Sequence, residues 1–110
     1  MKFKMNDRTW EIKEVSQEEL CKIEEVELDS VGKFFGVCAY ESQTIYLWNV
    51  LCEEQKRQTL MHELMHCYIA CYCSFEDMTW NEDLLCNISA NSHDIIHKIV
   101  EDYFNFVDME

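Results

Sequence analysis

The chain has no proline and only two glycines, Gly32 and Gly36, among its 110 residues. Flexible linkers between domains are rich in glycine, serine or proline, so this sequence offers no candidate linker. A chain of this length is long enough for one domain with a modest hydrophobic core. Because 48% of the residues are hydrophobic, we expect one folded domain over residues 1–110.

Basic residues are also scarce, since 9 Lys and Arg stand against 22 Asp and Glu and the formal net charge is −13. Such a surface repels nucleic-acid phosphates and anionic lipids, which argues against binding to either. No apolar run is long enough to cross a membrane, because His62, Glu63 and His66 interrupt the longest one. The first residues lack the apolar segment of a signal peptide, so we expect a cytoplasmic protein whose seven cysteines are reduced.

The most informative stretch is a His-Glu-x-x-His pattern formed by His62, Glu63 and His66. Positions four apart lie one turn apart on the same face of a helix, so both imidazoles can point at one ion. Glu63 lies about 100° around the helix from His62, near the ion but poorly placed to bind it beside both histidines. Two nitrogen ligands and a carboxylate that deprotonates a bound water are what a zinc hydrolase requires.

The apolar flanks distinguish this pattern from a chance match. They comprise Leu60, Met61, Leu64, Met65, Tyr68 and Ile69. They surround the polar residues on nearly every side, which predicts a buried helix. Buried polar groups cost free energy unless something pairs with them, and a metal ion would do so. The alternative interpretation is an ordinary core helix whose polar groups bond to their neighbours.

Alternation, capping and helical spacing predict the remaining elements. The expected elements are a strand at residues 9–15, a short helix opened by a Ser16/Glu19 capping box, strands at 34–40 and 44–48, a helix at 53–73, and a helix at 81–106 with Asn81 as its N-cap. The last two strands suggest a hairpin directly before the motif helix. An edge strand of that hairpin would lie along the cleft, where an extended peptide can bind by adding a strand.

A catalytic zinc ion usually has three protein ligands and an open position for water. Candidates for the third ligand are Glu82 and Asp83, at the start of the last expected helix, and Glu76 and Asp77 in the loop before it. Residues in the first turn of a helix can face an antiparallel neighbour, which favours Glu82 and Asp83. Spacing alone leaves both of these open.

The order of these features resembles the compact ImmA/IrrE-type, or minigluzincin, metallopeptidases of bacteria and phages. The resemblance covers roughly residues 34–91, and its firmest part is His62-Glu63-x-x-His66. It implies an α+β domain in which a small antiparallel sheet of about three strands packs on the motif helix and a C-terminal helix. It also implies a zinc metalloendopeptidase, and because analogues often cut a repressor or another regulator, a protein or peptide substrate.

In that family the third ligand is typically a glutamate, followed three and four residues later by a small residue and by Asn or Asp. Asp83 takes the glutamate position here, because Cys86 and Asn87 follow it at those offsets. The implied site has His62, His66 and Asp83 as Zn²⁺ ligands and Glu63 as general base. Asn87 would support the ligands without binding the ion. Aspartate is one methylene shorter than glutamate, so either the two helices approach more closely or Glu82 replaces Asp83.

Other candidates have simpler explanations. His93 and His97 repeat the four-residue spacing, but with no carboxylate pattern beyond Asp94 we expect surface or core histidines. Three tyrosines are candidates for stabilising an oxyanion: Tyr46, Tyr68 and Tyr72. The rival function is a non-catalytic regulatory or interaction domain that keeps a metal for stability. Glu63 argues against it, since a purely structural site needs no general base.

Overall fold

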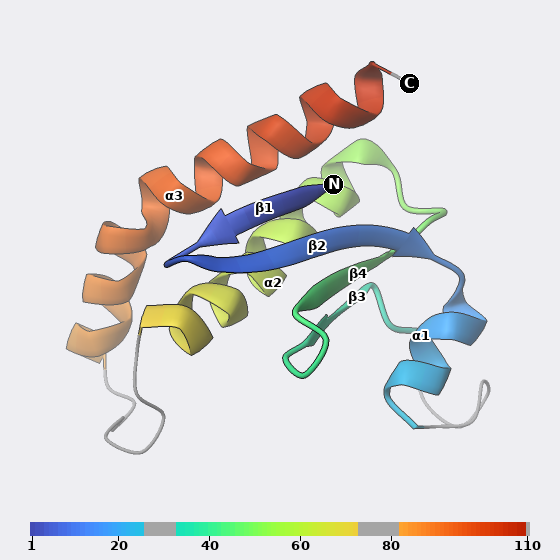
Figure 1. The fold of residues 1–110 in the computed structure, drawn as a ribbon, viewed down its shortest axis with the longest axis horizontal. Helices are drawn as coiled ribbons and strands as arrows, with labels where there is room; N and C mark the ends of the chain where they lie inside the picture. The colour runs from blue at the N-terminus through green and yellow to red at the C-terminus, as the bar shows by residue number, and fades with distance from the viewer. Residues whose placement is uncertain (26–32, 73–81, 110) are drawn as a thin grey trace.

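The computed structural model describes the backbone of residues 1–25, 33–72 and 82–109, and the side chains of these residues except 82–91. In chain order the elements are β1 (Lys2–Met5), β2 (Arg8–Val15), α1 (Gln17–Ile23), β3 (Gly36–Ala39), β4 (Thr44–Trp48), α2 (Glu53–Tyr72) and α3 (Glu82–Asp108). The expected α+β class is confirmed (Figure 1). The expected hairpin is β3 and β4, and the motif helix is α2.

The strands form one four-stranded sheet in the order β1-β2-β4-β3. β1 pairs antiparallel with β2, and β3 pairs antiparallel with β4, but β2 and β4 run parallel. The expectation of about three antiparallel strands is therefore corrected to four strands in a mixed sheet. A parallel pair needs a long crossover, and the chain between Val15 and Thr44, which includes α1, provides it.

β1 is the strand that the sequence patterns did not predict. It joins β2 through Asn6 and Asp7, whose φ angles of 50° and 64° are the positive values that tight hairpin turns require. Asn6 also donates its side-chain N–H to the carbonyl oxygen of Cys71 at 2.7 Å. That bond satisfies one of the carbonyl groups left free at the end of α2, so the first turn of the chain fixes the motif helix.

Helix α1 is tied to the chain that leads into β3. Ser16 caps it as expected, because its side chain accepts a hydrogen bond from the Glu19 N–H at 3.2 Å. Gln17 is buried, and its amide donates to the Phe34 carbonyl and accepts from the Phe34 N–H, both at 2.8 Å. These two hydrogen bonds to Phe34 fix the backbone that enters β3 relative to α1.

The hydrophobic core lies between one face of the sheet and the helices α2 and α3 (Figure 1). Its largest contributors are Met5, Trp10, Ile12, Ile45 and Leu47 from the strands, Leu60, Leu64 and Cys67 from α2, and Ile96, Ile99, Val100, Tyr103 and Phe104 from α3. The α3 residues recur at helical spacing, as expected. In the described part of the chain, no helix is both long and apolar enough to cross a membrane.

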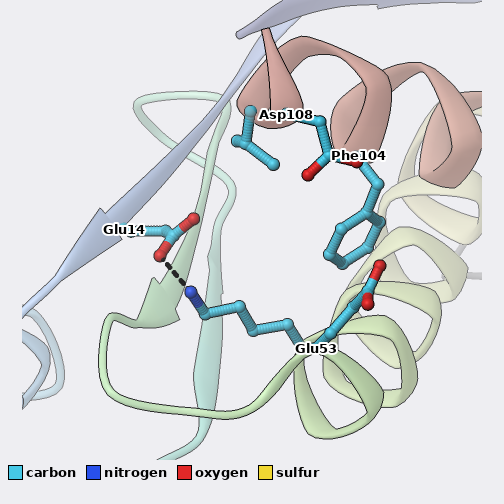
Figure 2. Close-up of a pocket in the computed structure, with 6 residues that line it drawn as sticks. Glu14, Glu53, Phe104 and Asp108 are labelled. Carbon is cyan, nitrogen blue, oxygen red and sulfur yellow. Dashed lines mark hydrogen bonds and ion pairs between the residues drawn. The ribbon is translucent and has the colours of Figure 1, made fainter. Parts of the chain in front are cut away.

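A polar joint connects β2, α2 and α3. The Glu14 carboxylate pairs with the Lys56 ammonium at 2.6 Å and accepts a hydrogen bond from the Tyr103 hydroxyl. Arg57 adds a second link, because it donates to Glu101 at 2.7 Å and lies 4.3 Å from the centre of the Phe104 ring. Figure 2 shows Glu14, Glu53, Phe104 and Asp108 around the cavity of about 210 Å³ at this joint. Because Lys56 and Glu14 neutralise each other, we interpret the joint as structural.

Candidate metal centre

His62 and His66 form a pair on α2 that fits one metal ion. Their Nε2 atoms lie 3.2 Å apart, and their ring centres are 4.9 Å apart at an interplanar angle of 74°. Two imidazole nitrogens that bind one tetrahedral zinc ion at 2.0–2.1 Å must be roughly 3.3 Å apart. The histidine pair therefore already has the separation that shared coordination requires.

The histidines lie on the exposed face of α2, so the expectation of a helix buried on nearly every side is wrong. Both are exposed, and Met61 beside them is 44% exposed. The opposite face carries Leu60 and Leu64, which are fully buried against the sheet. The sequence did not predict which face is exposed, because apolar residues occur on both faces of α2. The exposed face is the one that an ion and a substrate can reach.

Glu63 lies on the buried side of the pair, with 8% of its surface exposed. Burial is the main reason that its pKa is raised, while the charge of His62 lowers it and the charge of Glu24 raises it further. Burial also lowers the pKa of His66, as does the charge of His62. A lowered pKa keeps His66 neutral, which is the form that binds a metal ion.

Strand β3 approaches α2 closely at Gly36, beside Glu63. Two cavities, of about 280 and 250 Å³, meet there and share Gly36 and Glu63. The larger is completed by Phe35, Gln58, Thr59 and His62, and the smaller by Glu24, Phe34, Val37, Cys38, Tyr40 and His66. We call the two together the motif cleft. Since β3 is an edge strand of the sheet, the expectation that an edge strand lies along this cleft is confirmed.

The third ligand remains a prediction. Glu82 and Asp83 lie in the first turn of α3, which contacts α2, but their side chains fall outside the described set. The predicted roles of Glu76, Asp77, Asn81 and Asn87 also concern residues or side chains beyond it. Within the described residues, no group of three or more His, Cys, Asp or Glu is arranged to hold a metal ion.

The second histidine pair does not gain further ligands. His93 and His97 are exposed and their rings stack with centres 5.6 Å apart, and His93 lies 3.4 Å from the Asp94 carboxylate. No third ligand from the described side chains joins them. We keep the interpretation of these two residues as surface histidines.

Tyr40 is the tyrosine that lines the motif cleft, and no sequence pattern singled it out. Tyr46 lines a different cavity, and Tyr68 and Tyr72, whose rings lie 4.7 Å apart, are not among the residues that line the cleft. Alternation does not single out this cavity, because Val37 lines it together with Phe34, Gly36, Cys38 and Tyr40. The local signal here is the lone glycine, which within a strand pattern indicates a close approach of another element.

Comparisons with models of protein families, with curated proteins and with solved structures gave no match. The function therefore has to be inferred from the geometry of the cleft. Three of its features bear on chemistry: the spacing of the histidine pair, the buried carboxyl group beside it, and the adjacent edge strand.

Proposed function

We propose that this protein is a zinc-dependent peptidase that hydrolyses a peptide bond in a protein or peptide substrate. The observation that carries the proposal is the 3.2 Å separation of the His62 and His66 Nε2 atoms, beside the buried Glu63, in an open cleft. A purely structural zinc site is closed by four protein ligands and needs neither a cleft nor a neighbouring base.

Each residue of the proposed site has a separate role. His62 and His66 would hold the ion through their Nε2 atoms, and Asp83, or Glu82 in its place, would be the third ligand. Zinc, when bound, supplies a Lewis acid that activates water and polarises a carbonyl group. A carboxylate oxygen of Glu63 takes the proton of the attacking water and then gives it to the leaving amine nitrogen.

The edge strand supplies a place for the substrate backbone. An extended peptide that adds to β3 would form main-chain hydrogen bonds along the open edge. Because Gly36 brings β3 close to Glu63, such a peptide would run past the carboxyl group. Tyr40 lines the same cleft, and burial is the main reason that its pKa is raised to about 12. Its hydroxyl therefore stays protonated at neutral pH and is suited to donate a hydrogen bond to an oxyanion.

We also propose that the protein works in the cytoplasm. Cys21, Cys38, Cys52, Cys67 and Cys71 are free thiols in the structure. Free thiols stay reduced most readily in the cytosol.

Zinc analysis tests the metal site directly. We expect one equivalent of zinc in the purified protein and its loss in His62→Ala and in His66→Ala. Variants His93→Ala and His97→Ala are matched controls, since they remove the other pair with the same spacing, and both should keep the metal. Asp83→Asn and Glu82→Gln identify the third ligand, because only the true ligand should weaken zinc binding. Full zinc content in the His62→Ala variant would refute the site.

A Glu63→Gln variant tests the enzymatic reaction. General acid–base catalysis contributes about 10²–10⁴-fold, so hydrolysis of peptide libraries should fall by that range while zinc content and folding persist. Unchanged biological activity in this variant would favour the alternative of a non-catalytic, metal-stabilised regulatory domain.

A further inference from the structure

The smaller cavity of the motif cleft contains an acidic residue from a separate element. Glu24, at the end of α1, lines this cavity together with Glu63 and His66. None of the described residues that line it is a lysine or an arginine. On the basis of the peptidase function above, we propose that this cavity binds a lysine or arginine side chain of the substrate and that Glu24 is the specificity-determining residue.

The Glu24 carboxylate is available to a ligand. It is exposed, and no ion pair within the described residues engages it. It lies beside the proposed reaction site, because Glu63 and His66 line the same cavity. A cationic side chain in the cavity would meet a carboxylate that this part of the chain leaves without a counter-charge.

The stability of α1 does not explain an acidic residue at this position. Glu24 is the C-cap of the helix, and its N–H bonds to the Leu20 carbonyl oxygen at 3.1 Å. The C-terminal end of a helix carries a partial negative charge, so a carboxylate there is unfavourable. By contrast, Glu18 and Glu19 lie in the first turn, where acidic residues are favourable. Glu24 lines the cavity at this end of the helix.

The walls of the cavity suit the rest of a basic side chain. Phe34 is half-buried and Tyr40 is 46% exposed, so both offer ring surface to an alkyl stem and to a cation. The two hydrogen bonds between Gln17 and the Phe34 backbone hold this wall against α1, which carries Glu24. The backbone that carries Glu24 and the Phe34 side of the cavity are thus held together.

Peptide binding tests the proposal without requiring turnover. The probes are fluorescent octapeptide libraries in which one position at a time is arginine, lysine, norleucine or glutamate. They are titrated against the zinc-loaded Glu63→Gln protein and followed by fluorescence anisotropy. An exposed ion pair and a cation–π contact each contribute a factor of a few, so we expect about tenfold tighter binding of arginine or lysine than norleucine at one position.

Variants of Glu24 in the same background assign that preference to its charge. Glu24→Gln should reduce the preference to less than about twofold, and Glu24→Lys should shift it toward glutamate. Glu25→Gln is the matched control, because Glu25 is the adjacent exposed glutamate and does not line the cavity. It should leave the preference unchanged.

Three outcomes would overturn the proposal: no binding of any peptide, binding without charge preference, or a preference that survives Glu24→Gln. Cleavage of the same libraries by the zinc-loaded wild type separates this proposal from the peptidase function. Cleavage without preference for a basic residue retains the peptidase and removes the role of Glu24. Charge-selective binding without cleavage retains the role of Glu24 and removes the peptidase.

Discussion

Gly36 of β3 lies so close to Glu63 of α2 that a Cβ atom at position 36 would be 3.4 Å from the Glu63 Cγ atom. The same Cβ atom would be 2.6 Å from the Thr59 Cγ2 atom and 3.1 Å from the Tyr46 carbonyl oxygen. The backbone at Gly36 does not have a positive φ, so glycine is required for space and not for conformation. This contact sets how near the edge strand comes to the carboxyl group.

A Gly36→Ala substitution should therefore push β3 away from α2. We expect a loss of about 1–3 kcal/mol in the free energy of unfolding, the usual cost of overpacking, and a fall in peptidase activity. Zinc content should be unchanged, since both histidines lie on α2. The double variant Gly36→Ala, Thr59→Ser removes the Cγ2 atom that makes the closest contact and should recover part of both losses. A fully stable and active Gly36→Ala variant would show that the contact does not position Glu63.

Local patterns were enough to predict most of the elements. The Ser16 cap, the β3–β4 hairpin and the motif helix each follow from residues near one another in the chain, and each was confirmed. The parallel pairing of β2 with β4 was not predictable in this way, because it depends on where the crossover through α1 places the returning chain. β1 was missed because its four residues give only a short alternation.

The candidate site was predictable only along the helix. Spacing placed His62 and His66 together, but it did not show which face of α2 is exposed, because apolar residues surround the motif. Glu24 and Tyr40 reach the cleft from other elements, and only tertiary packing brings them there. Of the residues that close the cleft, Gly36 alone carried a local signal, as a single glycine within a strand pattern.

The burial of Glu63 has a consequence for the zinc-free protein. The pKa of Glu63 in the folded state is raised above its ordinary value of 4.5, so the carboxyl group stabilises the fold below that pH. This stabilisation is lost as the pH rises through the raised pKa, because the folded state must then carry a buried charge. A Glu63→Gln variant carries no such charge. In urea unfolding without zinc, it should be at least as stable as the wild type at pH 7.

The pH dependence of this difference checks the cause. The difference in stability between Glu63→Gln and the wild type should disappear near pH 4, where the glutamate is neutral like the glutamine. Glu41→Gln, at an exposed position in the β3–β4 turn, serves as the control and should change stability by less than about 0.5 kcal/mol. Lower stability of Glu63→Gln at pH 7 would mean that the carboxylate is stabilised by contacts that outweigh its burial.

The cleft should also make the protein sensitive to alkali. Burial is the main cause that raises the pKa of Cys38 from 9.0 to about 12 and that of Tyr40 from 10.0 to about 12. The unfolded chain loses these protons at a lower pH than the folded chain, so the free energy of unfolding should fall between about pH 9 and 12. A Cys38→Ser variant should show a shallower decline in urea unfolding over this range. Cys52→Ser, at an exposed cysteine, should follow the wild-type curve, and an identical curve for Cys38→Ser would contradict the assignment.

The joint of Glu14, Lys56 and Tyr103 should stabilise the fold without affecting the cleft. Tyr103→Phe removes the hydroxyl that donates to the half-buried Glu14 carboxylate, and hydrogen bonds to charged groups contribute about 1.5–3 kcal/mol. We expect the free energy of unfolding, measured in urea, to fall by that amount. Zinc content should be unchanged, because Glu14 and Lys56 line a separate cavity and Tyr103 lies in the hydrophobic core.

The exposed pair Lys98–Asp102 provides the matched comparison. Its atoms are 2.7 Å apart, close to the 2.6 Å of Lys56–Glu14, but its side chains are 77% and 49% exposed, against 19% and 25%. Water screens exposed ion pairs, so Asp102→Asn should change stability by no more than about 1 kcal/mol. Equal effects of Tyr103→Phe and Asp102→Asn would show that burial does not strengthen the joint. A larger loss in Tyr103→Phe alone would locate the stabilisation where β2, α2 and α3 meet.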